Sequence, residues 1–114
     1  DLVETMPVPK ELKVNETAEI RCELKREGRW EDTRYTIRWF LFDGEGTLKL
    51  DDGTVLLPND RYPLEKETFR LYYTRLSDEQ SSFTVWVEDS DGQAVELEYD
   101  FNADNDKEDG YGTE

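Results

Sequence analysis

Histidine is absent from the 114-residue chain, and Cys22 is its only cysteine. Without histidine the chain lacks the commonest general base and the commonest transition-metal ligand, which excludes Ser-His-Asp and Cys-His catalysis. A single cysteine can form neither an intrachain disulfide nor a zinc site built on several cysteines. Because Cys22 is in phase with Ile20 and Leu24, we expect a buried, unreactive thiol. We therefore predict that the protein is not an enzyme and has no catalytic residues and no cofactor.

Positive charge and long apolar runs are also scarce. The 14 lysines and arginines stand against 29 aspartates and glutamates, which gives a formal net charge of −15 at pH 7. Direct nucleic-acid binding is not expected, because a phosphate backbone needs a basic face, and an anionic membrane surface is disfavoured for the same reason. No run approaches the roughly 20 apolar residues of a transmembrane helix. A cationic partner or a divalent cation stays open, beside the simpler interpretation that the charge maintains solubility.

What the sequence does contain is alternation of apolar and polar residues with a period of two. This pattern predicts short strands, separated by turn signals, at residues 4–8, 18–26, 33–42, 47–50, 54–57, 67–75, 82–89 and 93–102. About seven or eight strands at spacings of roughly 8 to 12 residues are typical of an antiparallel β-sandwich or barrel. We predict one all-β domain over residues 1–103 and a disordered acidic tail over residues 104–114.

Proline and glycine refine this prediction locally. Pro7 and Pro9 restrict the first strand to a sheet edge or a kink, because proline cannot donate to a ladder. Gly53, after two aspartates, predicts a hairpin between the strands at 47–50 and 54–57. Residues 58–63, with a proline at each end, are predicted to form a loop.

Asp89, Ser90, Asp91 and Gly92 lie between the last two predicted strands. Two carboxylates and a glycine make Asp89 and Asp91 a weak candidate for a calcium site. The further ligands of a calcium loop are missing, and strict alternation resumes at Val95. A tight hairpin turn, with glycine in a left-handed conformation, is the favoured interpretation.

Four aromatic side chains fall on the opposite side of their strands from the predicted core, namely Phe40, Phe42, Tyr72 and Trp86. Phe40 and Trp86 would be neighbours if their strands pair, as the third and sixth strands of such folds usually do. An apolar cluster on a sheet face marks a contact surface. Arg38 shares this face, and Trp30 is a further aromatic residue in a predicted loop. We predict a partner-binding patch of Arg38, Phe40, Phe42, Tyr72, Trp86 and Trp30. The alternative is that a loop or the N-terminal segment covers it.

Outward carboxylates accompany outward arginines and lysines, so cross-strand ion pairs are the simplest account of both. If residues 33–42 lie near the last two strands, the residues expected to pair are Arg34, Arg38, Glu88, Glu96 and Glu98.

Two buried positions and one turn resemble an immunoglobulin-like module. Cys22 on the second long strand and Trp39 on the next are similar to the immunoglobulin core pair. The run FTVWVEDSDGQ, from Phe83, resembles the penultimate strand and turn of bacterial immunoglobulin-like modules. Val85 or Val87 stands where a second cysteine would be, so packing must replace the disulfide. The resemblance implies an antiparallel immunoglobulin-like β-sandwich.

Longer phrases resemble the TraQ-type family of conjugative transposons in Bacteroides-like bacteria. The phrases are VETMPVPK, EIRCELKREGRWEDTRYTIRWFLFDGEG, DDGTVLLPNDRYPL and FRLYYT, and the resemblance covers residues 3–103. It implies an accessory protein of a DNA-transfer apparatus in the cell envelope, periplasmic or associated with the outer membrane. It also implies a signal or lipoprotein segment in the precursor, which would account for a chain that starts at Asp1.

The function we expect is therefore non-enzymatic docking on other proteins of a conjugation apparatus. The partners would be proteins, with no direct contact to nucleic acid and no transmembrane segment in this chain. The alternative function is a calcium- or carbohydrate-binding β-sandwich module, in which sheet-face aromatic rings stack on sugars.

Overall fold

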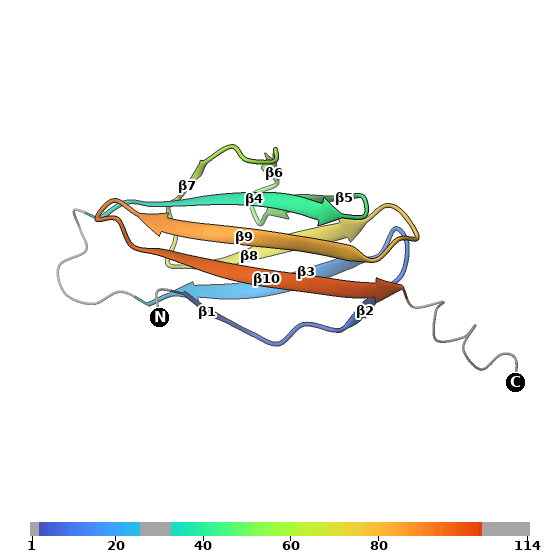
Figure 1. Ribbon diagram of the computed structural model, residues 1–114. Helices are drawn as coiled ribbons and strands as arrows, with labels where there is room; N and C mark the ends of the chain where they lie inside the picture. The colour runs from blue at the N-terminus through green and yellow to red at the C-terminus, as the bar shows by residue number, and fades with distance from the viewer. Residues whose placement is uncertain (1–2, 26–32, 104–114) are drawn as a thin grey trace, which may run out of the picture.

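Two five-stranded β-sheets pack face to face in the computed structural model, which describes residues 3–25 and 33–103 (Figure 1). The first sheet has the order β1 (Val3–Thr5), β3 (Thr17–Leu24), β8 (Thr68–Arg75), β5 (Gly46–Leu50) and β6 (Val55–Leu56). The second has the order β2 (Glu11–Leu12), β10 (Ala94–Ala103), β9 (Ser81–Asp89), β4 (Tyr35–Asp43) and β7 (Tyr62–Leu64). The described residues form no helix, and the predicted all-β class is confirmed.

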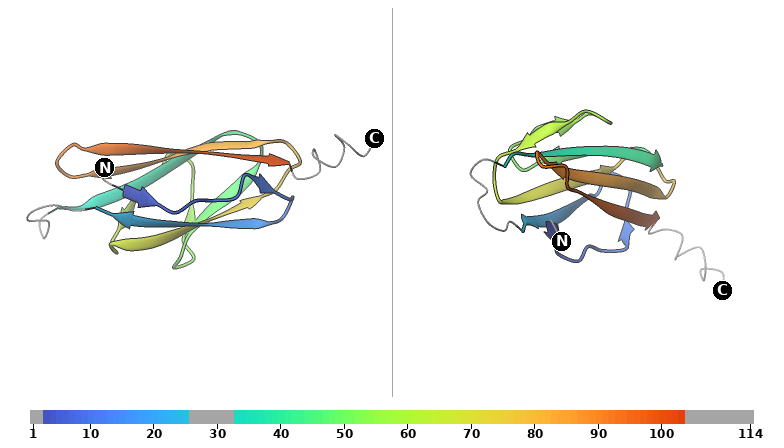
Figure 2. Two further views of the ribbon diagram at one scale, coloured as in Figure 1. Left: turned by 90° about the horizontal axis from the view of Figure 1, so that it is seen from below. Right: turned by 60° about the vertical axis from the view of Figure 1, so that its left-hand side comes forward.

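The described residues form ten strands rather than the seven or eight predicted, and the additional strands are short. The predicted first strand at 4–8 is wrong in its bounds, because the chain forms β1 and β2 on either side of the Pro7 and Pro9 pair. β1 pairs with β3 in one sheet, and β2 pairs with the end of β10 in the other. The predicted kink is therefore a crossing from one sheet to the other, and the left view of Figure 2 shows this segment running between β10 and β3.

β7 begins within the segment 58–63 that was predicted to be a loop. Its residues Tyr62–Leu64 pair with Tyr35–Ile37 of β4 at the outer edge of the second sheet. Proline is tolerated at such an edge because its missing N–H is not needed by a further strand, so Pro63 can occupy the middle of β7. The hairpin of β5 and β6 is confirmed, with Gly53 at a φ of 93° in its turn.

The core consists of the inward side chains of both sheets. Trp39 is 2% exposed and packs edge-on against Phe83 and Tyr73, with ring centroids 5.6 and 6.2 Å apart. Its indole N–H donates to the Leu56 carbonyl oxygen at 2.9 Å, and the Tyr73 hydroxyl bonds Ser81 Oγ at 2.8 Å. The polar tips of these rings are thus satisfied inside the core, which makes burial of the whole ring favourable.

Cys22 lies in this core, as its alternation with apolar neighbours predicts. It is 2% exposed, and burial raises the pKa of its thiol to about 12. A thiolate is the reactive form of cysteine, and a pKa this far above pH 8 leaves almost no thiolate. The expected burial of Cys22 is confirmed, and its low reactivity stays a prediction.

We predict that Cys22 of the native protein does not react with a disulfide-exchange reagent at pH 8 on the timescale of minutes. The same thiol should react completely once denaturant exposes it, since its pKa then returns to the ordinary value of about 8.5. A colorimetric thiol count with and without denaturant measures this. Rapid, stoichiometric labelling of the native protein would contradict the buried placement.

Arg75 of β8 is a charged residue inside the structure, with 1% of its surface exposed. Its guanidinium donates to the Leu12 carbonyl oxygen of β2 and, at 2.8 and 3.2 Å, to the Glu79 carbonyl oxygen beyond the end of β8. Its own backbone pairs with the turn before β3, at Asn15 and Glu16. One side chain thus joins β2 to the β8–β9 connection at one end of the two sheets.

Replacing Arg75 with methionine should lower the free energy of unfolding by about 3 kcal/mol, because the buried Leu12 and the partly buried Glu79 carbonyl oxygens would lose their donor. The matched control is Arg70→Met on the same strand, an exposed residue whose ion pair with Glu19 contributes little to stability. Urea denaturation of both variants measures the difference. Equal losses in the two variants would show that Arg75 has no special structural role.

Candidate partner-binding face

Arg38 and Trp86 face each other on the outer surface of the second sheet. The antiparallel register of β4 and β9 places them directly opposite, and the Arg38 guanidinium carbon lies 4.1 Å from the centre of the Trp86 ring. A cation held over an indole face is attracted to its negative quadrupole, which orients both side chains. The predicted pairing of the strands at 33–42 and 82–89 is therefore confirmed.

Phe42 lies on the outward side of β4, as alternation predicts, at an irregularity in the same strand pair. Leu41 pairs with Phe83 and Asp43 with Ser82, so Phe42 is left without a partner in the register. Phe42 is 58% exposed. Its ring packs edge-on against Phe40, with centroids 5.0 Å apart. Phe42 is the most exposed large apolar side chain that the structure describes.

Beside these rings the outer surface of β9 and β10 forms an open depression of about 370 Å³. Its lining residues are Phe42, Ser82, Phe83, Thr84, Trp86, Glu96, Glu98, Tyr99 and Asp100. The indole N–H of Trp86 donates to Glu96 Oε2 at 2.9 Å, which secures the ring against β10. Ser82 makes a hydrogen bond to Asp100 in the same way. The depression is thus aromatic on one side and acidic on the other.

The N-terminal segment does not cover this face. β1 pairs with β3 in the opposite sheet, and β2 adjoins only the end of β10, so both lie at the sheet edges (Figure 1). The connection between β6 and β7 does reach Arg38, whose guanidinium donates to Asn59 Oδ1 at 3.3 Å. We name the group Arg38, Phe40, Phe42 and Trp86 the aromatic face; of its members, Arg38, Phe40 and Trp86 are half-buried.

Two members of the predicted patch do not join the aromatic face. Tyr72 lies on β8, on the outer surface of the other sheet, where its hydroxyl bonds Glu19 Oε2 at 3.3 Å. Trp30 lies outside the described residues. Glu96, Glu98 and Asp100 border the depression but were not counted as site residues. Their alternation along β10 placed them on one face, and only the pairing of β10 with β9 puts that face beside Trp86.

The weak calcium candidate at Asp89 and Asp91 is a hairpin turn in the structure. One carboxylate oxygen of Asp89 accepts the backbone N–H groups of Asp91 and Gln93 at 2.9 and 2.8 Å. Gly92 has a φ of 94°, as a turn glycine should. In the described part of the chain no three acidic or cysteine side chains are grouped so that they could hold a metal ion.

Ion pairs connect neighbouring strands, as expected, although not always between the predicted partners. Arg70 of β8 pairs with Glu19 of β3 at 3.0 Å. Glu88 pairs with Arg61, at 2.8 Å, and not with an arginine of β4. The hydrogen bond from Arg61, with its positive charge, holds the pKa of Glu88 below the ordinary value of 4.5.

Arg61→Gln should raise the pKa of Glu88 towards its ordinary value, because the charged donor is removed. Since the folded-state pKa is the lower one, this pair contributes stability above about pH 4.5 that is lost as the pH falls through the folded value. Titration of the carboxyl resonances by NMR gives the pKa directly. Arg70→Gln is the control, and an identical Glu88 titration in both variants would refute the assignment.

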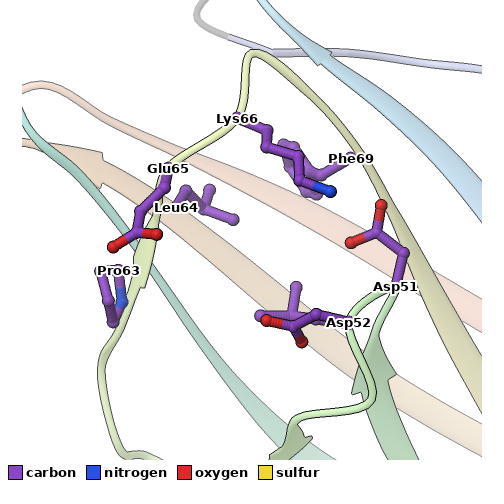
Figure 3. Close-up of a pocket in the computed structure, with 8 residues that line it drawn as sticks. Asp51, Asp52, Pro63, Leu64, Glu65, Lys66 and Phe69 are labelled. Atoms are coloured by element: carbon purple, nitrogen blue, oxygen red, sulfur yellow. The ribbon is translucent and has the colours of Figure 1, made fainter.

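A second hollow, between the β5–β6 turn and β7, is too small for a ligand. Figure 3 shows the carboxylates of Asp51, Asp52 and Glu65 around it, with Leu64 and Phe69 behind. Its volume is about 70 Å³, whereas sites for small molecules usually have about 300 Å³ or more. Asp52 is also occupied, because its carboxylate accepts the Thr54 N–H at 3.0 Å.

The chain and its fold are similar to those of known proteins. The TraQ conjugal transfer protein family matches residues 2–104. The chain belongs to this family. The family resemblance that the sequence motifs predicted is thereby confirmed. None of the curated proteins compared with the chain matches it.

Solved structures of this kind have the same fold. A solution structure of a lipoprotein from Bacteroides thetaiotaomicron is 62% identical, with a TM-score of 0.84 over 94% of this chain and 82% of the other. A crystal structure of a conjugative transposon lipoprotein from Bacteroides eggerthii is 58% identical, with a TM-score of 0.83 over 88% and 94%. A conjugate transposon protein from Bacteroides vulgatus is 51% identical, with a TM-score of 0.81 over 88% and 82%. Within the described residues of this chain, no helix has the length and apolarity needed to cross a membrane.

Proposed function

We propose that this TraQ-family chain is a non-enzymatic docking module of a conjugation apparatus, and that it binds partner proteins through its aromatic face. The observation that carries the proposal is the outward Phe42 beside Phe40, on a sheet surface that no other described strand covers. Exposed aromatic rings beside an arginine are the side chains that most often supply binding energy in protein interfaces. Membership of a conjugal transfer family supports partners among the transfer proteins.

We also infer that the two sheets form an immunoglobulin-like sandwich. The orders β1-β3-β8-β5 and β10-β9-β4 correspond to the two sheets of a constant-type immunoglobulin domain. The core pair supports this, because Cys22 and Trp39 are both buried. The connection between β5 and β8 departs from that pattern, since the chain adds β6 beside β5 and then β7 beside β4 in the other sheet before it forms β8.

The proposed location is the cell envelope. Two of the similar solved structures are described as lipoproteins, one of them a conjugative transposon lipoprotein. A lipid anchor in the precursor of this chain would hold the two sheets at a membrane surface with no transmembrane helix of their own. No observation favours the alternative of a calcium- or carbohydrate-binding module.

Docking through the aromatic face is tested by Phe42→Ser combined with Trp86→Ser. We expect conjugation frequency to fall by about tenfold or more, because losing central aromatic contacts weakens an interface by at least that factor. Melting temperature and expression level are measured in parallel, so that a folding defect is recognised. The matched control is Tyr72→Ser, a half-buried aromatic residue on the outer face of the other sheet.

A photo-crosslinking residue placed at position 42 should capture a transfer protein in donor cells, whereas the same residue at position 72 should not. Wild-type transfer by the folded double variant, together with no crosslink from position 42, would overturn docking through this face. Equal effects at positions 42 and 72 would mean that the aromatic face has no special role.

A further inference from the structure

One long edge of the second sheet has no neighbouring strand. β10 pairs with β9 on one side from Ala94 to Phe101. On its other side it pairs with β2 only at Asn102 and Ala103. Along residues 94–101 no described strand lies beside this edge, and Figure 1 shows β10 as the lower border of its sheet.

The N-terminal segment passes near this edge without completing the sheet. Between β1 and β2 the chain contains Pro7 and Pro9, which have no N–H to donate. Its backbone reaches β3 through Met6, which donates to the Arg21 carbonyl oxygen at 3.0 Å, and does not reach β10 until Lys10. The sequence of this segment therefore leaves the edge-facing N–H and C=O groups of β10 free to pair with another strand.

The direction of the free backbone groups follows from one hydrogen bond. The Asn102 N–H donates at 2.9 Å to the Lys10 carbonyl oxygen, on the side away from β9. In an antiparallel strand the N–H and C=O of one residue point to the same side, and successive residues alternate. Glu96, Glu98 and Asp100 are in phase with Asn102, so their backbone groups point to the free edge.

The side chains of these same three residues, which we name the acidic row, lie on the outer surface beside Trp86. Alternate residues of a strand are roughly 7 Å apart, so the row is a regular line of negative charge. No lysine or arginine of the described residues lies within ion-pair distance of it. On other surfaces Glu19 and Glu88 do have such partners.

We propose that the free edge of β10 binds an extended segment of a partner protein that carries lysine or arginine at alternate positions. Such a segment would add a strand to the sheet, with backbone hydrogen bonds to the acidic-row residues. Its basic side chains would lie opposite the three carboxylates, where opposite charges across neighbouring strands stabilise the pairing. Its intervening side chains would point towards Val95 and Leu97, which are partly buried against the core.

Like charge argues against two other possible occupants of this edge, a second copy of the chain and the chain's own C-terminal segment. A second copy paired through β10 would bring two acidic rows onto neighbouring strands, and like charges in that arrangement repel. The segment at 104–114 of the same chain contains Asp104, Asp106, Glu108 and Asp109 with a single lysine, so its charge has the wrong sign. A basic strand from another protein is the occupant that the edge and its charge both fit.

The test uses a blocked heptapeptide with lysine at alternate positions and threonine or valine between them. It is titrated into the isotope-labelled protein and followed by amide chemical shifts and hydrogen exchange. We expect saturable shifts along residues 94–101 and slower exchange of their edge-facing amides. N-methylation of the peptide backbone should abolish the exchange protection, because the added strand could then no longer pair.

The triple variant Glu96→Gln, Glu98→Gln and Asp100→Asn keeps a hydrogen-bond acceptor at each position and should bind the peptide about tenfold more weakly. The matched control, Asp51→Asn with Asp60→Asn and Glu65→Gln, removes the same charge from exposed residues elsewhere and should bind as the wild type does. If the triple variant is poorly folded, the salt dependence of binding to the wild-type protein replaces it, and affinity should fall as salt rises.

Three outcomes would overturn the proposal: no saturable shifts on β10, equal weakening in the two triple variants, or equal binding of the N-methylated peptide. Dimerisation through β10 at millimolar concentration would assign the edge to a second copy instead. This proposal rests on the proposed docking function, but each of the two can be refuted by its own experiment. Peptide binding is measured without transfer assays, and the Phe42 and Trp86 experiment does not require a free edge.

Discussion

The antiparallel register between β4 and β9 determines what both faces of the second sheet present. In this register Trp39 lies beside Val85 in the core, and Arg38 lies beside Trp86 on the outside. A shift by one residue would exchange the two faces, since the side-chain period of a strand is two. The core ring cluster and the aromatic face are thus two consequences of one pairing, and the bulge at Phe42 lies where that pairing ends.

Proline supplies the second constraint. The N-terminal segment has enough residues to line β10, yet Pro7 and Pro9 prevent it from donating hydrogen bonds there. Because the prolines interrupt the segment, β1 pairs in the first sheet and β2 pairs in the second. The buried Arg75 guanidinium then holds β2 in place by donating a hydrogen bond to the Leu12 carbonyl oxygen. The edge of β10 stays open because the N-terminal segment, which could have covered it, pairs with both sheets instead.

Much of the fold was predictable, because alternation alone located the long strands and the hairpin at Gly53. The short strands β2 and β7 were not predictable, since two or three residues carry no periodicity and β7 contains a proline. The aromatic face was predicted for Arg38, Phe40, Phe42 and Trp86. Tyr72 was grouped with them wrongly, because alternation tells which residues leave the core but not which sheet they belong to. That assignment depends on pairing between residues far apart in sequence.

The distribution of charge separates the acidic row from the general acidity of the chain. With a net charge of −15 most carboxylates need no explanation beyond solubility, and an exposed ion pair contributes little to stability. Yet Glu19 and Glu88 are both accompanied by arginines, whereas the three carboxylates of β10 stand together without a described cation. Such repulsion along a free edge disfavours pairing with an identical strand, which protects an exposed edge from aggregation. The same charges lower the free energy of a complex with a basic strand, so one arrangement both rejects self-association and selects a partner.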